Sequence, residues 1–213
     1  MPLLPIRHGS FTVEVIDMTD RISLEDELKR IQSSGMAPRL MLHCCCAPCA
    51  SYVLEFLSSF FSITILFYNP NIQPREEFDK RAAEFNKLLM FAQYPNSVDI
   101  IVGDYNSSVF KDATAPFMNE PEGGRRCLVC FDLRLSETAK RAKEGGYEFF
   151  ATTLSVSPHK NATMLNEIGN ELAGLTGLKF LNADFKKRDG YKRSIELSKK
   201  FGLYRQMYCG CVA

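Results

Sequence analysis

The residues of this 213-residue chain best suited to chemistry are eight cysteines, which fall into three short clusters. The clusters are Cys44-Cys45-Cys46-Ala47-Pro48-Cys49, Cys127-x-x-Cys130 and Cys209-Gly210-Cys211. A chain of this length buries a full core and needs no disulfide staples to fold. Structural cysteines of secreted domains are usually spread along the chain, and no export signal is visible at the N-terminus. Metal binding or redox chemistry in a reducing cytosol is therefore favoured over a disulfide framework.

The first two clusters together hold enough sulfur for a metal centre. Each lies at the N-terminus of a predicted helix, where the helix dipole lowers the pKa of a thiol and favours the metal-binding thiolate. A C-x-x-C pair and a vicinal cysteine pair supply four thiolates, which is enough for an iron–sulfur cluster. A structural zinc site would use the same four ligands. Because zinc knuckles usually consist of two C-x-x-C units, the cluster is favoured and zinc is the open alternative.

The third cluster has a different spacing. The single residue Gly210 between Cys209 and Cys211 lets the backbone bend enough for a C-x-C disulfide. Such a small ring is strained, so the bond would be labile rather than structural. A pair of this kind near a flexible C-terminus could deliver two electrons. The alternative is that these two cysteines are additional metal ligands.

The hydropathy pattern that must position these clusters alternates strand and helix. Strands are predicted at 40–43, 62–68, 98–102, 149–154 and 178–181, and helices at 47–60, 75–91, 127–143, 161–172 and 190–201. Residues 106–126 break the pattern and are expected to form an insertion or mobile loop with a short helix at most. The alternation predicts an α/β fold with three α/β/α layers and a mostly parallel five-stranded sheet. Residues 1–38 are expected to be a peripheral extension with a short helix capped by Ser23, and 39–213 the catalytic domain.

The polar loops of this pattern should meet at one edge of the sheet. Each predicted strand is followed by a loop of reactive or polar residues: Cys44–Cys49, Asn69-Pro70-Asn71, Asp104, Ser155–Lys160 and Asp184–Lys187. Ligands of such sheets bind at the carboxyl ends of the strands. At that edge Asp104 and Asp184 could donate a proton or bind a metal, although capping a turn is an equally good role for them. His43, at the end of the first strand, could bond a thiolate or simply be a satisfied strand-end residue.

The C-terminal part of the chain is basic. Between Lys179 and Ala213 nine Lys or Arg residues face three Asp or Glu, a net charge of +6. Such a segment could bind a polyanion, with interleaved tyrosines stacking on bases, or could be a solvated helix face. The glycine-rich phosphate loops of nucleotide-binding proteins are missing, which argues against bound NAD or Walker-type ATP. No apolar run approaches about 18 residues, so no membrane span is expected.

Several motifs, taken together, resemble one known family. They are His43-x-Cys45-Cys46-x-Pro48-Cys49, Phe67-Tyr68-Asn69-Pro70-Asn71-Ile72-x-Pro74, Arg126-Cys127-x-x-Cys130-Phe131-x-x-Arg134-Leu135, Thr152-Thr153-Leu154-x-x-Ser157-Pro158-x-Lys160, Asp184-Phe185-Lys186-Lys187 and Leu203-Tyr204-Arg205-Gln206-x-Tyr208-Cys209-Gly210-Cys211. In this order, over about residues 40–211, the chain resembles the epoxyqueuosine reductase QueH family.

The resemblance implies a reaction, a cofactor and a location. Members of this family reduce epoxyqueuosine to queuosine at the wobble position of tRNAs with a GUN anticodon, the last step of queuosine synthesis. The implied fold is similar to that of the adenine nucleotide α-hydrolases. A [4Fe–4S] cluster is implied, and a second iron can lie beside it. The protein would be cytoplasmic and would draw on an electron donor that the sequence does not identify.

The resemblance also assigns roles to individual residues. It implies that Cys45, Cys46, Cys127 and Cys130 hold the cluster, that Cys49 is a natural ligand of a second iron, and that Cys209 and Cys211 form a redox-active disulfide. Cys44 receives no role. Asp104 or Asp184 could protonate the departing oxygen. The residues expected to contact the substrate or the tRNA are His43, Tyr68, Asn69, Asn71, Arg126, Ser157, Lys160, Lys186, Lys187 and Arg205.

Two other functions remain open at this point. A cluster-dependent tRNA thiolation enzyme could use a similar fold, but it would need ATP. In this chain cysteines replace the nucleotide loop that such enzymes carry after the first strand. A zinc-stabilised tRNA-binding module without catalysis would use the same cysteines and the same basic segment.

Overall fold

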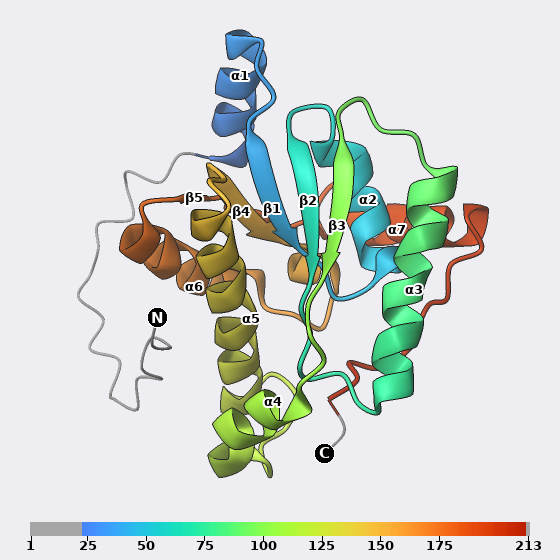
Figure 1. The fold of residues 1–213 in the computed structure, drawn as a ribbon, viewed down its shortest axis with the longest axis vertical. Helices are drawn as coiled ribbons and strands as arrows, with labels where there is room; N and C mark the ends of the chain where they lie inside the picture. The colour runs from blue at the N-terminus through green and yellow to red at the C-terminus, as the bar shows by residue number, and fades with distance from the viewer. Residues whose placement is uncertain (1–22, 212–213) are drawn as a thin grey trace.

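A parallel five-stranded sheet forms the centre of the computed structural model, which describes residues 23–211 (Figure 1). The strands are β1 Arg39–His43, β2 Ser62–Phe67, β3 Val98–Val102, β4 Phe149–Thr152 and β5 Lys179–Phe180. Their order is β3-β2-β1-β4-β5, and every neighbouring pair is parallel. The chain first winds outward from β1 to β3 and then returns to pair β4 with β1. The strand order therefore reverses between β1 and β4, and ligands of open α/β sheets bind at such a point.

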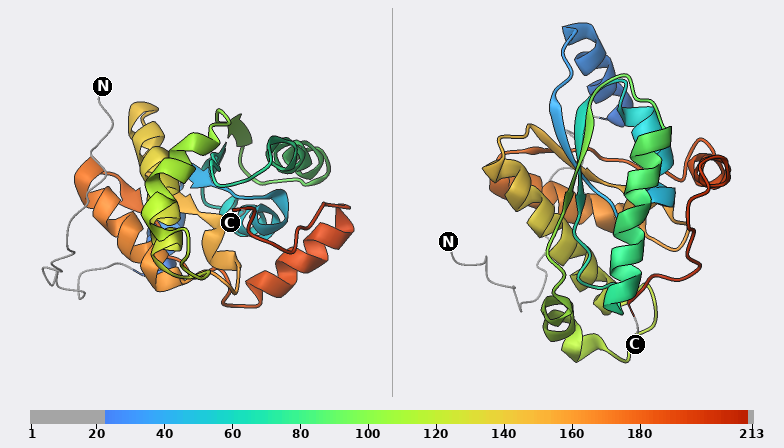
Figure 2. Two further views of the ribbon diagram at one scale, coloured as in Figure 1. Left: turned by 90° about the horizontal axis from the view of Figure 1, so that it is seen from below. Right: turned by 45° about the vertical axis from the view of Figure 1, so that its right-hand side comes forward.

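Helices cover both faces of this sheet (Figure 2). They are α1 Leu24–Ser34, α2 Ala47–Leu57, α3 Arg75–Phe91, α4 Ser107–Thr114, α5 Arg125–Glu144, α6 Ala162–Thr176 and α7 Gly190–Lys200. Helices α2, α3 and α7 lie on one face, and α5 and α6 on the other. The predicted three-layer α/β/α architecture is confirmed, while the closer likeness to nucleotide hydrolases stays a prediction.

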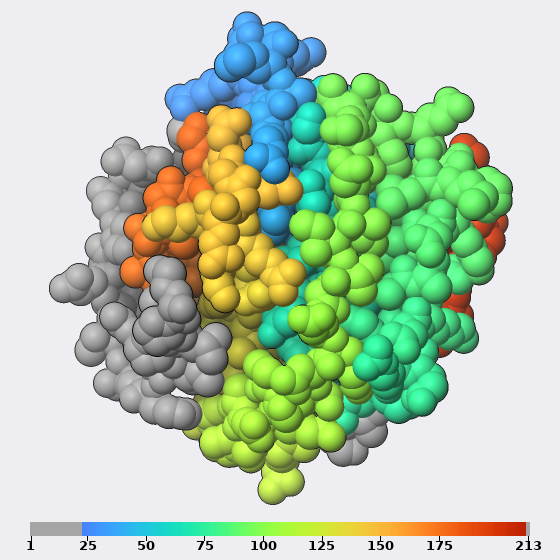
Figure 3. Space-filling model, viewed as in Figure 1, coloured from blue at the N-terminus to red at the C-terminus, as the bar shows by residue number. Residues whose placement is uncertain are grey.

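The side chains of β1 explain why there are two cores. Leu40 and Leu42 are buried beneath α2 and α3, whereas Met41 is buried against α5. Side chains alternate between the faces of a strand, so one apolar strand supplies both clusters. β3 is the edge strand and lies at the surface of the molecule (Figure 3). Its Ile101 and Val102 are exposed.

The predicted elements are present, several of them with shifted ends. The fourth strand stops at Thr152 rather than at 154, because the hydroxyl of Thr152 accepts a hydrogen bond from the amide of Leu154 (3.2 Å) and starts a 3-10 helix, Thr153–Val156. Residues 106–126, which are predicted to form an insertion or mobile loop with a short helix at most, contain more regular structure than expected. They hold α4, capped by Asn106, and the 3-10 helix Ala115–Phe117.

The N-terminal helix follows its prediction. The hydroxyl of Ser23 caps α1 by accepting from the amide of Asp26, and Leu28 and Ile31 are buried in the same cluster as Leu40. What the sequence predicts for residues 1–22 falls outside the described residues, and the division into an extension and a catalytic domain stays a prediction. Within residues 23–211, no helix is long and apolar enough to cross a membrane.

Candidate metal and redox site

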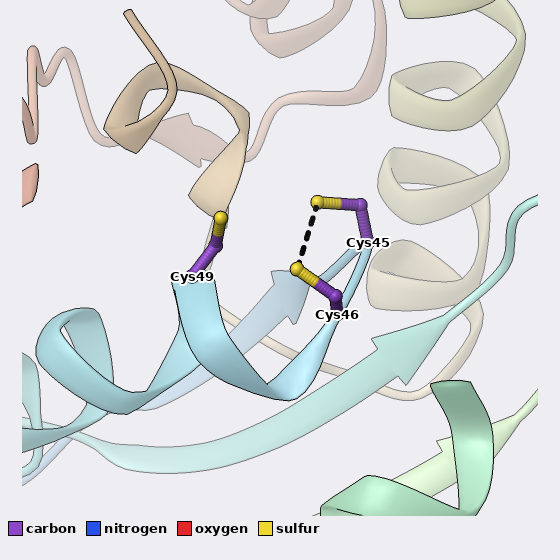
Figure 4. Close-up of side chains that lie close together, drawn as sticks. All are labelled: Cys45, Cys46 and Cys49. Carbon is purple, nitrogen blue, oxygen red and sulfur yellow. Dashed lines mark hydrogen bonds between the residues drawn. The ribbon is translucent and has the colours of Figure 1, made fainter. Parts of the chain in front are cut away.

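The loop after β1 gathers three of its four cysteines. Cys46 is the N-cap of α2 and Cys49 lies in the first turn of that helix, so the turn folds Cys49 back toward Cys45 and Cys46. The three sulfur atoms all lie within 4.8 Å of one another, and Cys45 donates a hydrogen bond to Cys46 with 3.8 Å between the sulfurs (Figure 4). Cys44 is fully buried in the apolar core beneath α2, apart from this triad.

Protonation within the triad is unequal. The hydrogen bonds from Cys45 and then Cys49 hold the pKa of Cys46 well below its usual range. Hydrogen bonds with Cys45 and then with Cys46 raise the pKa of Cys49, and the bond to Cys46 raises that of Cys45 to about 11. One thiolate thus accepts from two thiols. A metal ion binds such a set by replacing the protons, because cysteine ligates as the thiolate.

The C-x-x-C pair lies in the first turns of α5. Helix α5 begins at Arg125, so Cys127 and Cys130 are both near its N-terminus, and both are buried. The backbone amide of Gly123 donates a hydrogen bond to the Cys127 sulfur at 3.2 Å. Amide donors to sulfur stabilise a thiolate, and in iron–sulfur proteins they adjust the potential of the cluster. Burial is the main cause that raises the pKa of Cys130 to about 11 when no metal is bound.

The C-x-C pair reaches the C-x-x-C pair from the opposite end of the chain. After α7 the tail returns along α3 to the carboxyl edge of the sheet (Figure 2). There Cys209 and Cys211 line one narrow cleft together with Cys127 and Cys130. Cys45 packs against the apolar cluster that contains Cys127. The three cysteine clusters therefore meet in one region, as the placement of the loops predicts, and all eight cysteines are free thiols.

Buried cations surround these thiols. The side chain of Arg134 is 2% exposed and lines the cleft; its Nε donates to the carbonyl of Cys130 at 3.0 Å, and its Nη2 has no partner among residues 23–211. No carboxylate of the described residues forms a salt bridge with it. Arg126 also lines the cleft, and its buried Nε has no partner among residues 23–211. Unpartnered cationic N–H groups of this kind are costly unless an anionic group lies beside them. The residues therefore suit a negatively charged thiolate cluster.

The C-x-C pair is polarised. The hydrogen bond from Cys211 and then the ammonium of Lys160 hold the pKa of Cys209 well below its usual range, and the bond to Cys209 raises the pKa of Cys211. Lys160 is nearly buried between the Cys209 sulfur, 3.6 Å away, and the Glu122 carboxylate, 2.8 Å away. Lys160, which the sequence assigns to the substrate, thus contacts the thiol pair directly.

The polar residues after β1 and β2 mostly hold the site together. His43 is fully buried, and its two ring nitrogens lie 3.0 Å from the Thr152 hydroxyl and 3.1 Å from the Tyr68 carbonyl. Burial, followed by the charge of Arg134, lowers the pKa of His43 to about 3, so the ring is neutral at pH 7. The amide of Asn69 donates to the carbonyl of Cys44 at 2.9 Å. Within residues 23–211 the buried side-chain oxygens of Asn69 and Asn71 have no partner and could accept a bond from a ligand.

The two predicted proton donors do not line the cleft. Asp104 follows β3 and is exposed. Asp184 pairs with Lys186, its oxygen lying 3.0 Å from the ammonium nitrogen, and it caps its own turn by accepting from the amide of Lys186. A role for either carboxylate in proton transfer stays a prediction.

The remaining predicted contacts lie around the rim. Ser157 closes the turn that leads to Lys160, since the amides of His159 and Lys160 donate to its hydroxyl and carbonyl. Lys187 is exposed. Arg205 stacks over the ring of Tyr191 at 5.1 Å. Tyr68 is half-buried, and burial raises its pKa.

Sequence reasoning missed two residues of this site, Arg81 and Glu122. It quoted Arg134 within a motif but predicted no role for it. Arg134 stands one helical turn after Cys130, and this spacing could have indicated that it shares a face with the C-x-x-C pair. No local pattern marks Glu122 or Arg81, because Glu122 joins the site through Lys160 and Arg81 through the main-chain carbonyl of Cys209, both of them tertiary contacts.

Fold and site together define a parallel α/β protein with a buried, cysteine-lined site at the carboxyl edge of its sheet that could bind a metal. A sequence model described as epoxyqueuosine reductase QueH matches residues 40–213, and the chain belongs to this family. The epoxyqueuosine reductase QueH of Streptococcus pyogenes is 40% identical over 200 residues, which cover 91% of this chain and 76% of that protein. That of Staphylococcus epidermidis is 40% identical over 200 residues, 90% of this chain and 84% of the relative. The epoxyqueuosine reductase QueH of Thermotoga maritima is 35% identical over 179 residues, which cover 81% of this chain and 88% of that protein.

Proposed function

We propose that this protein is an oxidoreductase that reduces epoxyqueuosine to queuosine at the wobble position of tRNA. The observation that carries the proposal is the meeting of three cysteine clusters in one buried, cation-rich region of a QueH-family chain. The relatives share the name of a single activity, which favours neither a thiolation enzyme nor a zinc-stabilised binding module. The reaction is the last step of queuosine biosynthesis.

The chemistry needs two electrons and two protons. Both carbon–oxygen bonds of the epoxide break, a carbon–carbon double bond forms, and the oxygen leaves as water. Oxidation of the Cys209 and Cys211 thiols to a disulfide would release two electrons and two protons, which balances this change. An external electron donor must then reduce the disulfide for the next turnover. Asp104 and Asp184 are the proposed proton donors.

The cofactor we propose is a [4Fe–4S] cluster held by Cys45, Cys46, Cys127 and Cys130. When bound, such a cluster supplies electrons one at a time. The chain contributes the thiolates, the Gly123 amide bonded to Cys127, and the charge of Arg134. The close sulfurs of Cys45, Cys46 and Cys49 also support a second iron with Cys49 as a ligand.

The substrate we propose is a tRNA with a GUN anticodon, in the cytoplasm, where thiols stay reduced. The exposed Lys187 and the half-buried Lys186 and Arg205 are the proposed contacts to phosphates. The unpartnered oxygens of Asn69 and Asn71 are candidates for hydrogen bonds to the modified base. Tyr68, Arg126 and Ser157 complete the proposed contact set.

The test compares serine variants of three cysteines in anaerobically purified protein. Cys209→Ser and Cys211→Ser should abolish conversion of epoxyqueuosine in tRNA, measured by mass spectrometry of the nucleosides with a strong reductant present, while bound iron is retained. Cys44→Ser is the matched control, because Cys44 is buried away from the cleft and a serine hydroxyl there can bond the unpartnered hydroxyl of Thr153. It should keep activity. Full activity in both C-x-C variants would overturn the redox role of Cys209 and Cys211. No conversion by the wild-type protein with a strong reductant, or stoichiometric zinc in a colourless wild-type protein, would overturn the proposed function.

A further inference from the structure

Three charged residues on the inner side of α3 face the C-terminal tail. Glu77, Arg81 and Glu84 follow one another at helical spacing, so they share one side of α3, and all three are buried. Arg81 is among the largest fully buried side chains of the described residues, with 2% of its surface exposed. Buried charges are rare unless they are paired. The stripe has partners of two kinds: on α3 itself Arg81 pairs with Glu77 and Lys87 with Glu84, and further partners lie in the tail.

The guanidinium of Arg81 joins the helix to the C-x-C segment. Its Nε donates to the Glu77 carboxylate at 2.6 Å, and its Nη1 donates to the main-chain carbonyl of Cys209 at 3.0 Å. The next carbonyl, that of Gly210, accepts from the amide of Gln73 at 3.0 Å, in the turn that leads into α3. Two consecutive carbonyls of the C-x-C segment are thus bound to α3 and its entry turn.

The bend at Gly210 is shaped around the same guanidinium. Gly210 has a φ of +99°, a backbone conformation that residues other than glycine rarely adopt. A Cβ atom at this position would lie 3.0 Å from the Arg81 Nη2. The C-x-C bend therefore closes directly over Arg81, and a larger residue would be strained by its backbone as well as by this contact.

The upstream part of the tail is held by the two carboxylates of the stripe. The amide of Tyr204 donates to Glu84 at 2.7 Å, and the hydroxyl of Tyr204 donates to Glu77 at 3.3 Å. The ammonium of Lys80 lies 3.4 Å from the centre of the Tyr204 ring, a cation–π contact. The tail thus approaches the cleft over a second, separate anchor on the same helix.

We infer that Arg81 is a positioning residue that holds the Cys209-Gly210-Cys211 bend at the cleft by its main chain. Because Arg81 bonds a carbonyl and leaves both sulfurs free, the hold persists whether the two cysteines are thiols or a disulfide. The C-x-C pair is therefore a fixed part of the site rather than a mobile carrier. The role of this pair as a redox couple rests on the proposed function, whereas the anchoring itself does not.

The test measures the tail separately from the reaction. Arg81→Lys keeps the charge beside Glu77, but its donors all sit on one ammonium nitrogen and cannot reach Glu77 and the Cys209 carbonyl with the fork geometry of the guanidinium. The double variant Glu77→Gln with Arg81→Met removes both buried charges, so that neither remains unpaired. Arg75→Ala is the matched control, because Arg75 forms an exposed pair with Asp79 at the same spacing on the same helix. In each purified protein, hydrogen exchange is followed at the Gln73 amide, and maleimide labelling at Cys209 and Cys211.

In both Arg81 variants, the rate of hydrogen exchange at the Gln73 amide and the rate of maleimide labelling of the C-x-C thiols should be at least about tenfold higher than in the wild type. Arg75→Ala should match the wild type. Wild-type rates in a folded Arg81 variant would overturn the inference. If the C-x-C pair is not a redox couple, Cys209→Ser keeps its activity while the exchange at Gln73 still accelerates in the Arg81 variants. If only the anchoring is wrong, Cys209→Ser is inactive and Arg81→Lys behaves as the wild type in both readouts.

Discussion

The ammonium nitrogen of Lys160 lies 3.6 Å from the sulfur of Cys209. Lys160 is held there by Glu122 and is almost completely buried, so its charge acts on the thiol at short range with little screening by water. On its other side Cys209 receives a hydrogen bond from Cys211. The two cysteines are therefore unequal, with the thiolate at Cys209 and the proton at Cys211.

This asymmetry predicts the pH profile of thiol alkylation. Cys209 should react with iodoacetamide with a midpoint below the pH of about 8.5 that is typical of free cysteine, because Cys211, Lys160 and Arg134 favour its thiolate. Lys160→Met removes one of these causes and should move the midpoint upward by about one pH unit. Peptide mass spectrometry after pulse alkylation across pH 5–10 measures both values. Lys140→Met, an exposed lysine on α5, is the control and should change nothing; an identical shift in both variants would contradict the role of Lys160.

His43 predicts an acid-side loss of stability. Its folded pKa of about 3 is below the ordinary value of 6.5, so as the pH falls below 6.5 the unfolded chain gains a proton that the folded protein does not take up. The free energy of unfolding is therefore unaffected by His43 above pH 6.5. As the pH falls from 6 to 4, His43 lowers the free energy of unfolding by up to about 1.4 kcal/mol per pH unit. Urea unfolding at several pH values measures the slope. His43→Gln should flatten it, although that protein is less stable at pH 7, whereas His159→Gln, at an exposed position, should keep it.

The fold could be predicted well from the sequence where one local pattern decides it. The helix 75–91 and the strand 98–102 have the predicted ends, because an amphipathic stripe and a β-branched run bounded by turn residues define them. The strand at 149–154 is shorter than predicted, since the apolar run continues past the point where Thr152 turns the chain. A run of apolar residues does not show where a backbone hydrogen bond leaves the sheet.

The cysteines that gather at the site could be singled out from the sequence, but the charged residues around them could not. Spacing and helix position single out the cysteines, and the strand order brings their loops together. Arg75 and Arg81 each stand four residues from an acidic partner on α3, yet one pair is exposed and the other is buried under the tail. Local sequence is the same in kind for both pairs. The two pairs differ only because the C-terminal tail, more than a hundred residues further along the chain, covers Arg81 and not Arg75. No local periodicity in the sequence indicates that contact.

The cysteine assignment predicts the outcome of metal analysis. Cys127→Ser removes a proposed cluster ligand that also accepts the Gly123 amide, so most of the iron and the absorbance near 400 nm should be lost. Cys44→Ser, one residue from the triad but buried in the core, should keep both. Iron and sulfide assays with visible spectra on anaerobic protein decide this. Equal iron in the two variants would refute Cys127 as a ligand.

Arg134 predicts a shift in redox potential. Its buried cation is 2% exposed, lines the cleft beside Cys127 and Cys130, and has no carboxylate partner among residues 23–211, so it stabilises negative charge at these sulfurs. Adding an electron to a thiolate-bound centre increases that charge, and loss of the cation therefore disfavours the reduced state. Arg134→Met should lower the midpoint potential by on the order of 50–100 mV, which corresponds to a unit charge at about 7–14 Å with an effective dielectric constant near 20. Arg134→Lys should recover most of the shift, because charge rather than geometry is its cause. Spectroelectrochemical titration of both variants beside the wild type measures the shift. A potential that stays constant in Arg134→Met while iron is retained would show that the guanidinium has only a structural role, such as its bond to the Cys130 carbonyl of its own helix.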